Sequence, residues 1–204
     1  MKDICLTSAY LAPVEYFAFI LKANAVFIEQ YDNYIKQTYR NRCCIMTANG
    51  VMDLIIPVDK PSGEKVLTKD IRISQQTDWQ TLHWRAIESA YNSTPFFEYY
   101  KDDFIVFYQK KWVFLADFNQ AIQNKVFELI DVEPKIYHTS EYQDVLPENI
   151  LDLREKIHPK KETVSNSFPE YYQVFAQKFG FTPNLSIIDL LFNMGNESIL
   201  VLQK

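Results

Sequence analysis

Apolar runs and amphipathic stretches alternate along the first third of the chain. The run 3–8, DICLTS, predicts a strand, and the stretch 13–23, PVEYFAFILKA, predicts a helix with proline at its first position. The run 24–31, NAVFIEQY, predicts a second strand. Because strand, helix and strand follow one another within about thirty residues, this order favours parallel pairing through a right-handed crossover.

A hairpin is expected next, over residues 42–58. Its sequence, RCCIMTANGVMDLIIPV, holds two runs of β-forming residues on either side of Asn49-Gly50. Asn-Gly predicts a hairpin because both residues tolerate the positive φ angles of a tight turn. Shorter runs at 70–74 and 135–140 are further strand candidates. The first 75 residues therefore predict a mixed β-sheet, opened by the β-α-β unit and the hairpin and flanked by helices.

The second half of the chain is predicted to be mostly helical. Thr77 and Gln80 have the spacing of a capping box for a helix that ends at Tyr91, and Pro95 begins a helix that contains FFEYY and FIVFY. A longer amphipathic helix is expected within 112–130.

A short helix is also expected over 147–157, PENILDLREKI, before the chain turns at His158-Pro159. The class is therefore α/β. We expect one domain over 1–204, mainly sheet-forming in 1–75 and mainly helical in 76–204.

The C-terminal stretch 168–202 is too apolar to remain exposed to solvent. Its aromatic and apolar residues recur at helical spacing, with interruptions at Gly180, Pro183 and Gly195. Such a surface must be covered. We expect this aromatic tail either to pack on the main body or to form a homo-oligomer contact.

Composition and charge narrow the class of protein. With 204 residues, 48% of them apolar, the chain is long enough for a well-buried core. A net charge of -5 gives no basic face, so nucleic acid is not expected as a partner. No apolar run has the length of a membrane span and the N-terminus lacks a signal-peptide pattern, so a cytoplasmic location is expected. The three cysteines have no disulfide or zinc spacing, and no metal site is expected.

The polar segment 29–44, EQYDNYIKQTYRNRCC, follows the second predicted strand. In open α/β folds ligands bind beyond the carboxyl ends of strands, where Tyr10 should also lie. Lys36 and the arginines that follow can bind phosphate or carboxylate, and tyrosine rings can stack on a sugar or base. The alternative is a structural plug, in which Asn41 and Arg42 tie the loop to the sheet.

Familiar catalytic signatures are absent from the sequence, which has no GxGxxG, P-loop, GxSxG, HExxH or CxxC. His83 is the most interesting histidine, because it lies on a predicted helix with Trp79 four residues earlier. An imidazole there can serve as a general base or as a hydrogen-bond donor to substrate. The alternative is a histidine that is satisfied at a seam between helix and sheet.

Four ordered motifs carry a resemblance to a known family. They are YLAPVEYF at 10–17; Tyr34, Lys36, Tyr39, Asn41 and Arg42; Trp79, His83, Tyr91, Pro95 and Phe96; and PNLSIIDLLFNMG at 183–195, which includes Ser186, Asp189 and Asn193. In this order they resemble the WbqC-like proteins of bacterial O-antigen and related glycan gene clusters. Ser8-Ala9 departs from the family's usual Gln-Pro, and Cys43 stands where asparagine often follows the arginine.

The resemblance implies an enzyme, or a substrate-binding component, that acts on a nucleotide-linked or lipid-linked sugar in bacterial glycan biosynthesis. Acyl or aminoacyl transfer is the implied reaction, which makes the protein transferase-like, and no cofactor follows from it. The expected partner is a nucleotide sugar or another anionic small molecule. The expected substrate-binding residues are Tyr10, Tyr34, Lys36, Arg40, Asn41, Arg42 and Trp79, and His83 is the expected catalytic residue. The alternative is a non-catalytic interaction module that assembles with a glycan-pathway enzyme.

Overall fold

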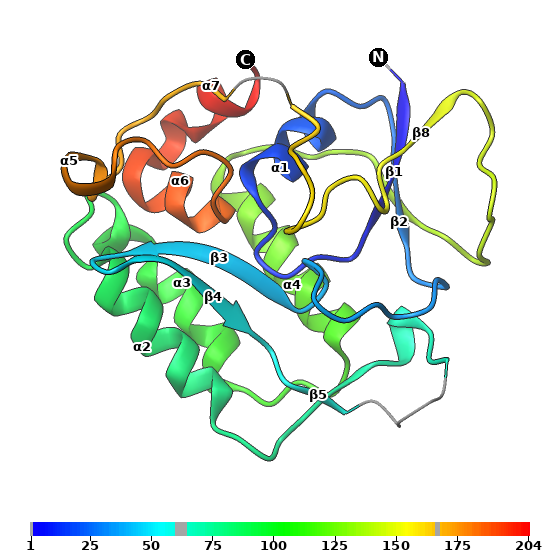
Figure 1. Cartoon of the computed structure of the whole chain (residues 1–204), viewed down its shortest axis with the longest axis horizontal. Helices are drawn as coiled ribbons and strands as arrows, with labels where there is room; N and C mark the ends of the chain where they lie inside the picture. Colours follow the sequence, from blue (N-terminus) through cyan, green and yellow to red (C-terminus); the bar gives the residue numbers. More distant parts are fainter. Residues whose placement is uncertain (1, 60–64, 166–167) are drawn as a thin grey trace.

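The computed structural model describes residues 2–59, 65–165 and 168–204 (Figure 1). Within these residues, four parallel strands form one sheet in the order β7-β2-β1-β8. The strands are β1 (Asp3–Thr7), β2 (Val26–Glu29), β7 (Ile136–His138) and β8 (Ile150–Asp152). The expected α/β class is confirmed, and two strands of the main sheet come from the mostly helical second half.

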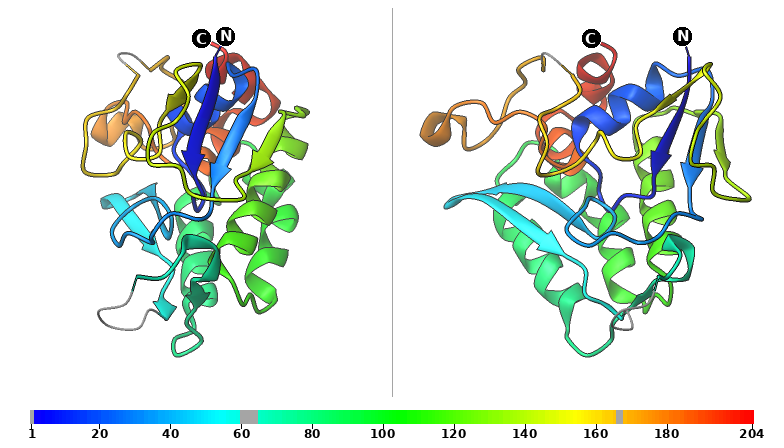
Figure 2. Two further views of the ribbon diagram at one scale, coloured as in Figure 1. Left: turned by 90° about the vertical axis from the view of Figure 1, so that its right-hand side faces the viewer. Right: turned by 45° about the vertical axis from the view of Figure 1, so that its right-hand side comes forward.

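The β-α-β unit forms as predicted. Helix α1 (Val14–Leu21) connects β1 to β2, and Ile4 pairs with Val26 in the parallel register. One face of the sheet is apolar and buried beneath α1 and α4 (Leu115–Leu129). The rings of Phe17 on α1 and Phe127 on α4 are in contact, with 5.5 Å between their centroids. Figure 2 shows α4 and the segment after β8 on opposite sides of β1 and β2.

The hairpin also forms, but it stands apart from the parallel sheet. Strands β3 (Arg42–Thr47) and β4 (Gly50–Ile55) pair only with each other and pack on helix α2 (Trp79–Tyr91). Both sides of β1 are already occupied, by β2 and β8, so the hairpin cannot join there. Strands β5 (Val58–Asp59) and β6 (Arg72–Ile73) form a further small antiparallel pair, and the short 3-10 turn η1 (Thr68–Asp70) precedes β6 in the sequence.

Two local predictions were wrong. The stretch 147–157 is not a helix, because β8 within it pairs with β1 along the register Ile4 to Leu151. Pairing with the free edge of β1 outweighs the intrinsic preference of this short segment for a helix. The capping box is also absent: Asp78 is the N-cap of α2 without a side-chain cap, and the Gln80 amide instead donates to the carbonyl oxygens of Phe107 and Lys110.

The aromatic core lies among helices α2, α3 (Phe97–Gln109), α4 and α6 (Ile187–Met194). Phe104 and Phe97 both contact the ring of Phe192, at 5.5 Å and 5.2 Å between centroids. Helix α4 begins at Leu115, because residues just before it are extended and Arg72 bridges to Phe114. Large rings in edge-to-face contact account for much of the buried area in this half of the molecule.

The C-terminal tail packs on the main body, which was one of its two expected arrangements. It contains α5 (Ala176–Phe179), α6, the η2 turn (Gly195–Glu197) and α7 (Ser198–Leu202). Buried Asp189 on α6 accepts a hydrogen bond from Tyr91 of α2, which ties the tail to the body, and another from Tyr171 within the tail. A homo-oligomer stays a prediction. In the described residues, no helix has the length and apolar character needed to span a membrane.

Candidate functional site

The parallel sheet has a topological switch point between β1 and β8. The chain runs from β1 to β2 and then to β7 on one side, and returns to β8 on the other side of β1. In open α/β sheets, ligands bind in the crevice beyond the carboxyl ends of strands at such a point. The switch point therefore identifies the carboxyl edge of this sheet as the candidate site.

A cavity of about 410 Å³ lies at this switch point. It is bounded by the segments that follow β2 and β8, and by part of the connection between β7 and β8. Its lining residues are Asp32, Asn33, Ile35, Tyr142, Asp144, Asp152, Arg154 and Glu155. We call this space the switch-point cavity. Its volume falls in the range of small-molecule sites.

Arg154 organises the wall of the switch-point cavity. Its Nε and Nη2 donate to the two oxygens of Asp152 at 3.0 Å and 2.7 Å, a bidentate pair, and Nη1 donates to Glu29 Oε2 at 3.3 Å. The Tyr142 ring lies 5.1 Å from the guanidinium carbon. Burial alone would raise the pKa of Asp152, but the hydrogen bonds and charge of Arg154 outweigh it and lower that pKa. The pair is thus ionised at neutral pH.

A second cavity of about 340 Å³ adjoins the face of the sheet that α1 and α4 do not cover. Glu29, His138 and Thr139 contribute to its lining, and the Thr139 hydroxyl donates to Glu29 Oε1 at 2.8 Å. His138 Nδ1 accepts a hydrogen bond from the Gln30 amide at 2.9 Å, and burial lowers the pKa of the imidazole. Burial raises the pKa of the Cys5 thiol in this wall to about 12, so it is no nucleophile at neutral pH. Arg154 binds residues of both cavity walls.

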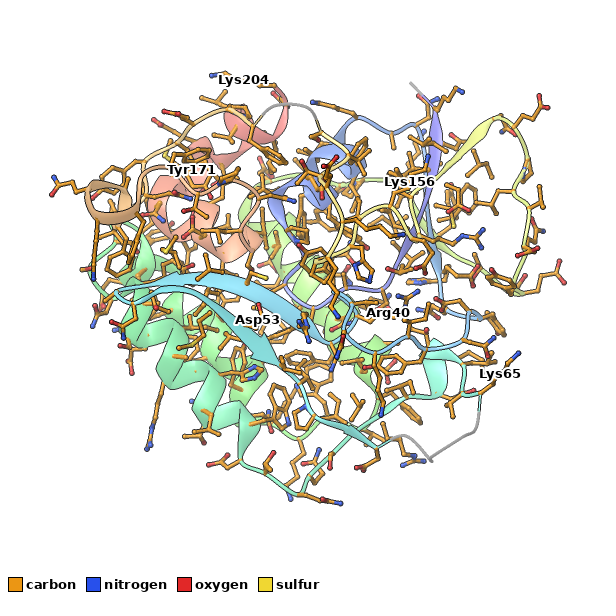
Figure 3. All side chains as sticks on the ribbon, viewed as in Figure 1. Arg40, Asp53, Lys65, Lys156, Tyr171 and Lys204 are labelled. Carbon is orange, nitrogen blue, oxygen red and sulfur yellow. The ribbon has the colours of Figure 1, made fainter. Side chains whose placement is uncertain are left out.

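Arg40, one of the predicted substrate-binding residues, lies in the polar segment between β2 and β3 (Figure 3). Its side chain is 2% exposed, and its Nη2 pairs with Asp32 and, at 3.2 Å, with Glu155. Both carboxylates line the cavity. Arg40 therefore holds two cavity residues in position, and its charge is already shared by two carboxylates.

Tyr10, Trp79 and His83 lie together in the interior of the protein. The Tyr10 hydroxyl donates to His83 Nδ1 at 3.0 Å and accepts from Tyr108 at 2.8 Å. His83 Nε2 donates to the Ile55 carbonyl oxygen at 3.2 Å. Burial lowers the pKa of His83 to about 4, against a smaller opposing effect of the Ile55 hydrogen bond. The imidazole is thus neutral, and both its nitrogens are engaged by the protein.

The remaining predicted residues lie along the polar segment and the hairpin. Asn41 Nδ2 donates to the Ile56 carbonyl at 2.8 Å, and Arg42 Nη1 pairs with Asp53 Oδ2 across the hairpin at 2.9 Å. Tyr34 is buried, which raises its pKa to about 12 despite the nearby arginines, whereas Lys36 is exposed. The structure therefore distributes the predicted residues among the interior, the polar segment and the hairpin, and none of them lines the switch-point cavity. Their binding roles stay predictions.

Sequence reasoning missed the residues that build the cavity walls. Asp152 and Arg154 lie at the end of β8, and the sequence had assigned that stretch to a helix. Had the run ILDL been interpreted as a strand, the carboxyl-edge rule would have placed both residues at the site. The same carboxyl-edge rule applies to His138, because it lies at the end of a predicted strand. Tyr142 lies in an irregular connection and carried no signal.

The described residues contain no group of three or more His, Cys, Asp or Glu side chains arranged to hold a metal ion. The cavity walls instead offer paired guanidinium and carboxylate groups with an aromatic ring beside them. Such an arrangement can orient a polar ligand through several hydrogen bonds.

Comparison with known proteins identifies the family. The sequence model of the WbqC-like protein family matches residues 8–166 and 160–201. The chain is also 24% identical over 223 aligned positions to a Mycobacterium tuberculosis (strain ATCC 25618 / H37Rv) protein named "Uncharacterized protein Rv1507c", covering 97% of this chain and 96% of that protein. No solved structure matches the chain. Since the family match spans nearly the whole sequence, the chain belongs to the WbqC-like protein family.

Proposed function

We propose that the protein binds a nucleotide-linked or lipid-linked sugar in the switch-point cavity and acts on it in bacterial glycan biosynthesis, as a transferase or as the substrate-binding component of one. The observation that carries the proposal is the cavity's place at the carboxyl edge of the parallel sheet, between the segments that follow β2 and β8. The substrate class follows from the family resemblance described above. Acyl or aminoacyl transfer is the reaction class that we carry forward.

The sugar and the diphosphate of such a substrate bind at different places under this proposal. The sugar lies against the exposed half of the Tyr142 ring, since aromatic faces pack well on the apolar faces of sugars. The diphosphate lies outside, toward Lys36, which follows the lining residue Ile35 and is exposed. Lys160, whose ammonium donates to Gln37, adds a second cation on the same side. Arg40 supports the cavity wall from behind.

The second candidate function is a non-catalytic interaction module that assembles with a glycan-pathway enzyme. The pair between Arg42 and Asp53 favours it, because it gives Arg42 a structural role in the hairpin. Under this alternative, Arg42→Ala changes stability or partner binding, and no sugar nucleotide binds to the full chain.

Isothermal titration calorimetry of the full chain with UDP-, GDP- and dTDP-linked sugars tests the first proposal. We expect at least one to bind, and Tyr142→Ala to weaken that binding about tenfold. Tyr172→Ala is the matched control, because Tyr172 is similarly exposed, at 56% against 50%, and lines neither cavity. The proposal fails if no sugar nucleotide binds, or if the two tyrosine variants bind alike.

A further inference from the structure

The switch-point cavity has an excess of negative charge. Four of its lining residues are carboxylates, namely Asp32, Asp144, Asp152 and Glu155, and Arg154 is the cation in the described lining. Arg40 reaches two of these carboxylates from behind. Two guanidinium groups thus face four carboxylates, and Glu29 takes up a further part of the charge of Arg154. A bare anion is repelled by such a wall, whereas a cation is attracted.

Nearby lysines do not remove this excess. Lys161 donates to the backbone carbonyl of Glu155 at 2.6 Å, and Lys160 donates to the neutral side chain of Gln37. Lys156 contributes to lowering the pKa of Asp152, but it is exposed and does not line the cavity. Exposed ammonium groups are largely screened by water and salt.

Asp32 provides a second and independent observation. Its side chain is 10% exposed and lines the cavity, and Oδ2 binds Arg40. Oδ1 is shielded from water and has no hydrogen-bond partner among the described residues. A buried carboxylate oxygen without a donor costs free energy, and a donor supplied by a ligand removes that cost. Because Asp32 lines the cavity, a ligand bound there can supply a donor to this carboxylate.

The remaining walls fit a ring with an apolar face. Tyr142 is 50% exposed and Ile35 is 43% exposed, and both line the cavity together with the charged groups. An aromatic ring and an aliphatic side chain bind the carbon-hydrogen faces of a sugar, while carboxylates bind its donors. The walls therefore combine sugar-packing surfaces with an excess of acceptors.

We infer that the switch-point cavity selects a sugar that carries a protonated amino group, whose ammonium donates to Asp32. This inference rests on the proposed function, since it names the substrate class of the same cavity. An ammonium group offers three donors and a positive charge, which match both the unpartnered oxygen and the charge excess. A hydroxyl or acetamido group at the same position lacks the charge.

Chemical-shift titration of the isotope-labelled full chain with glucosamine, glucose and N-acetylglucosamine tests the inference. We expect glucosamine to shift the amides around Asp32 and Asp152 and to bind about tenfold more tightly than either neutral sugar. Asp32→Asn, which keeps the size and removes the charge, should abolish this preference. Asp144→Asn changes an exposed carboxylate of the same lining, and we expect it to reduce the preference even if Asp32→Asn does not fold. Asp102→Asn, on the exposed side of α3, is the control and should leave it unchanged.

Equal binding of the three sugars, or a preference that survives both cavity variants, overturns the inference. The calorimetric experiment separates this failure from that of the proposed function. If sugar nucleotides bind and Tyr142→Ala weakens them, but amino and neutral sugars bind alike, the amine inference is wrong and the proposed function stands. If no sugar nucleotide and no sugar binds, both are overturned.

Discussion

Arg154 and Glu29 form an ion pair that is almost completely removed from water. Nη1 lies 3.3 Å from Oε2, and the two side chains are 6% and 0% exposed. Glu29 ends β2, and Arg154 follows β8 on the far side of β1. The pair therefore joins the strands on both sides of β1 and fixes the geometry of the switch point.

Removing one partner should be costly. In Arg154→Met the Glu29 carboxylate stays buried without its charged partner, and such changes lower the free energy of unfolding by about 3–5 kcal/mol. Urea denaturation followed by circular dichroism measures this loss. The double variant Glu29→Gln with Arg154→Met should lose less than the sum of the single losses, because the uncompensated charge is gone. Strict additivity would contradict a direct coupling between the two side chains.

Replacing the buried Asp189 carboxylate should also destabilise the chain. It accepts hydrogen bonds from Tyr91 at 3.0 Å, from Tyr171 at 2.7 Å and from Gln173 at 2.9 Å. Asp189→Asn turns one acceptor into a donor that faces other donors, and we expect a loss of about 2–3 kcal/mol in unfolding free energy. Asp102→Asn, on an exposed surface, should change stability by less than about 0.5 kcal/mol. Equal losses in thermal or urea unfolding would show that the donors around Asp189 do not depend on its carboxylate.

Local signals predicted the elements that depend on nearby residues. Pro13 marked the start of α1, and Asn49-Gly50 marked the turn between β3 and β4. Both signals reflect backbone angles that few other residues adopt easily. The parallel pairing of β1 with β2 followed from the short crossover between them.

Non-local pairing explains what the sequence could not reveal. Strand β8 has three residues, too few for a periodic pattern, and it forms because β1 offers an open edge far away in the sequence. The position of His83 likewise placed it on a helix beside Trp79, but spacing along the chain cannot tell whether its nitrogens meet a ligand or Tyr10. The walls of the switch-point cavity depend on the long-range pairing of β8 with β1, because Asp152 ends β8 and Arg154 follows it.

His83 should make stability depend on pH. Its pKa is about 4 in the folded chain against an ordinary 6.5, mainly because of burial. Between these values the unfolded chain binds the extra proton, so the free energy of unfolding falls as the pH falls from about 6.5 to about 4. The full difference corresponds to about 3 kcal/mol. Above pH 6.5 this residue should contribute no pH dependence.

The variant His83→Gln isolates this effect, because all other titrating groups are shared with the unmodified chain. The stability difference between the two proteins should be largest near neutral pH and shrink by up to about 3 kcal/mol toward pH 4. Urea unfolding at several pH values measures it. A difference that stays constant over this range would mean that His83 is not buried in its neutral form.

Gly195 and Phe96 bring together two of the motifs that carry the family resemblance. Gly195 has a φ of +58°, which side chains adopt rarely, and a Cβ there would lie 2.5 Å from Phe96 Cε1. The Phe96 backbone also donates to the Phe192 carbonyl at 3.0 Å. The glycine that closes α6 is thus required both by the backbone angle and by the phenyl ring against it.

Gly195→Ala should therefore destabilise the chain more than Gly50→Ala. Gly50 also has a positive φ, of +107°, but open space surrounds its missing Cβ, so its substitution carries only the conformational cost of about 1–3 kcal/mol. Gly195→Ala adds the cost of overpacking against Phe96, about 1–3 kcal/mol more. Thermal and urea unfolding of both variants compare the two losses. If Gly195→Ala lowers the free energy of unfolding no more than Gly50→Ala does, Phe96 can move aside at no energetic cost. The backbone angle alone then accounts for glycine at this position.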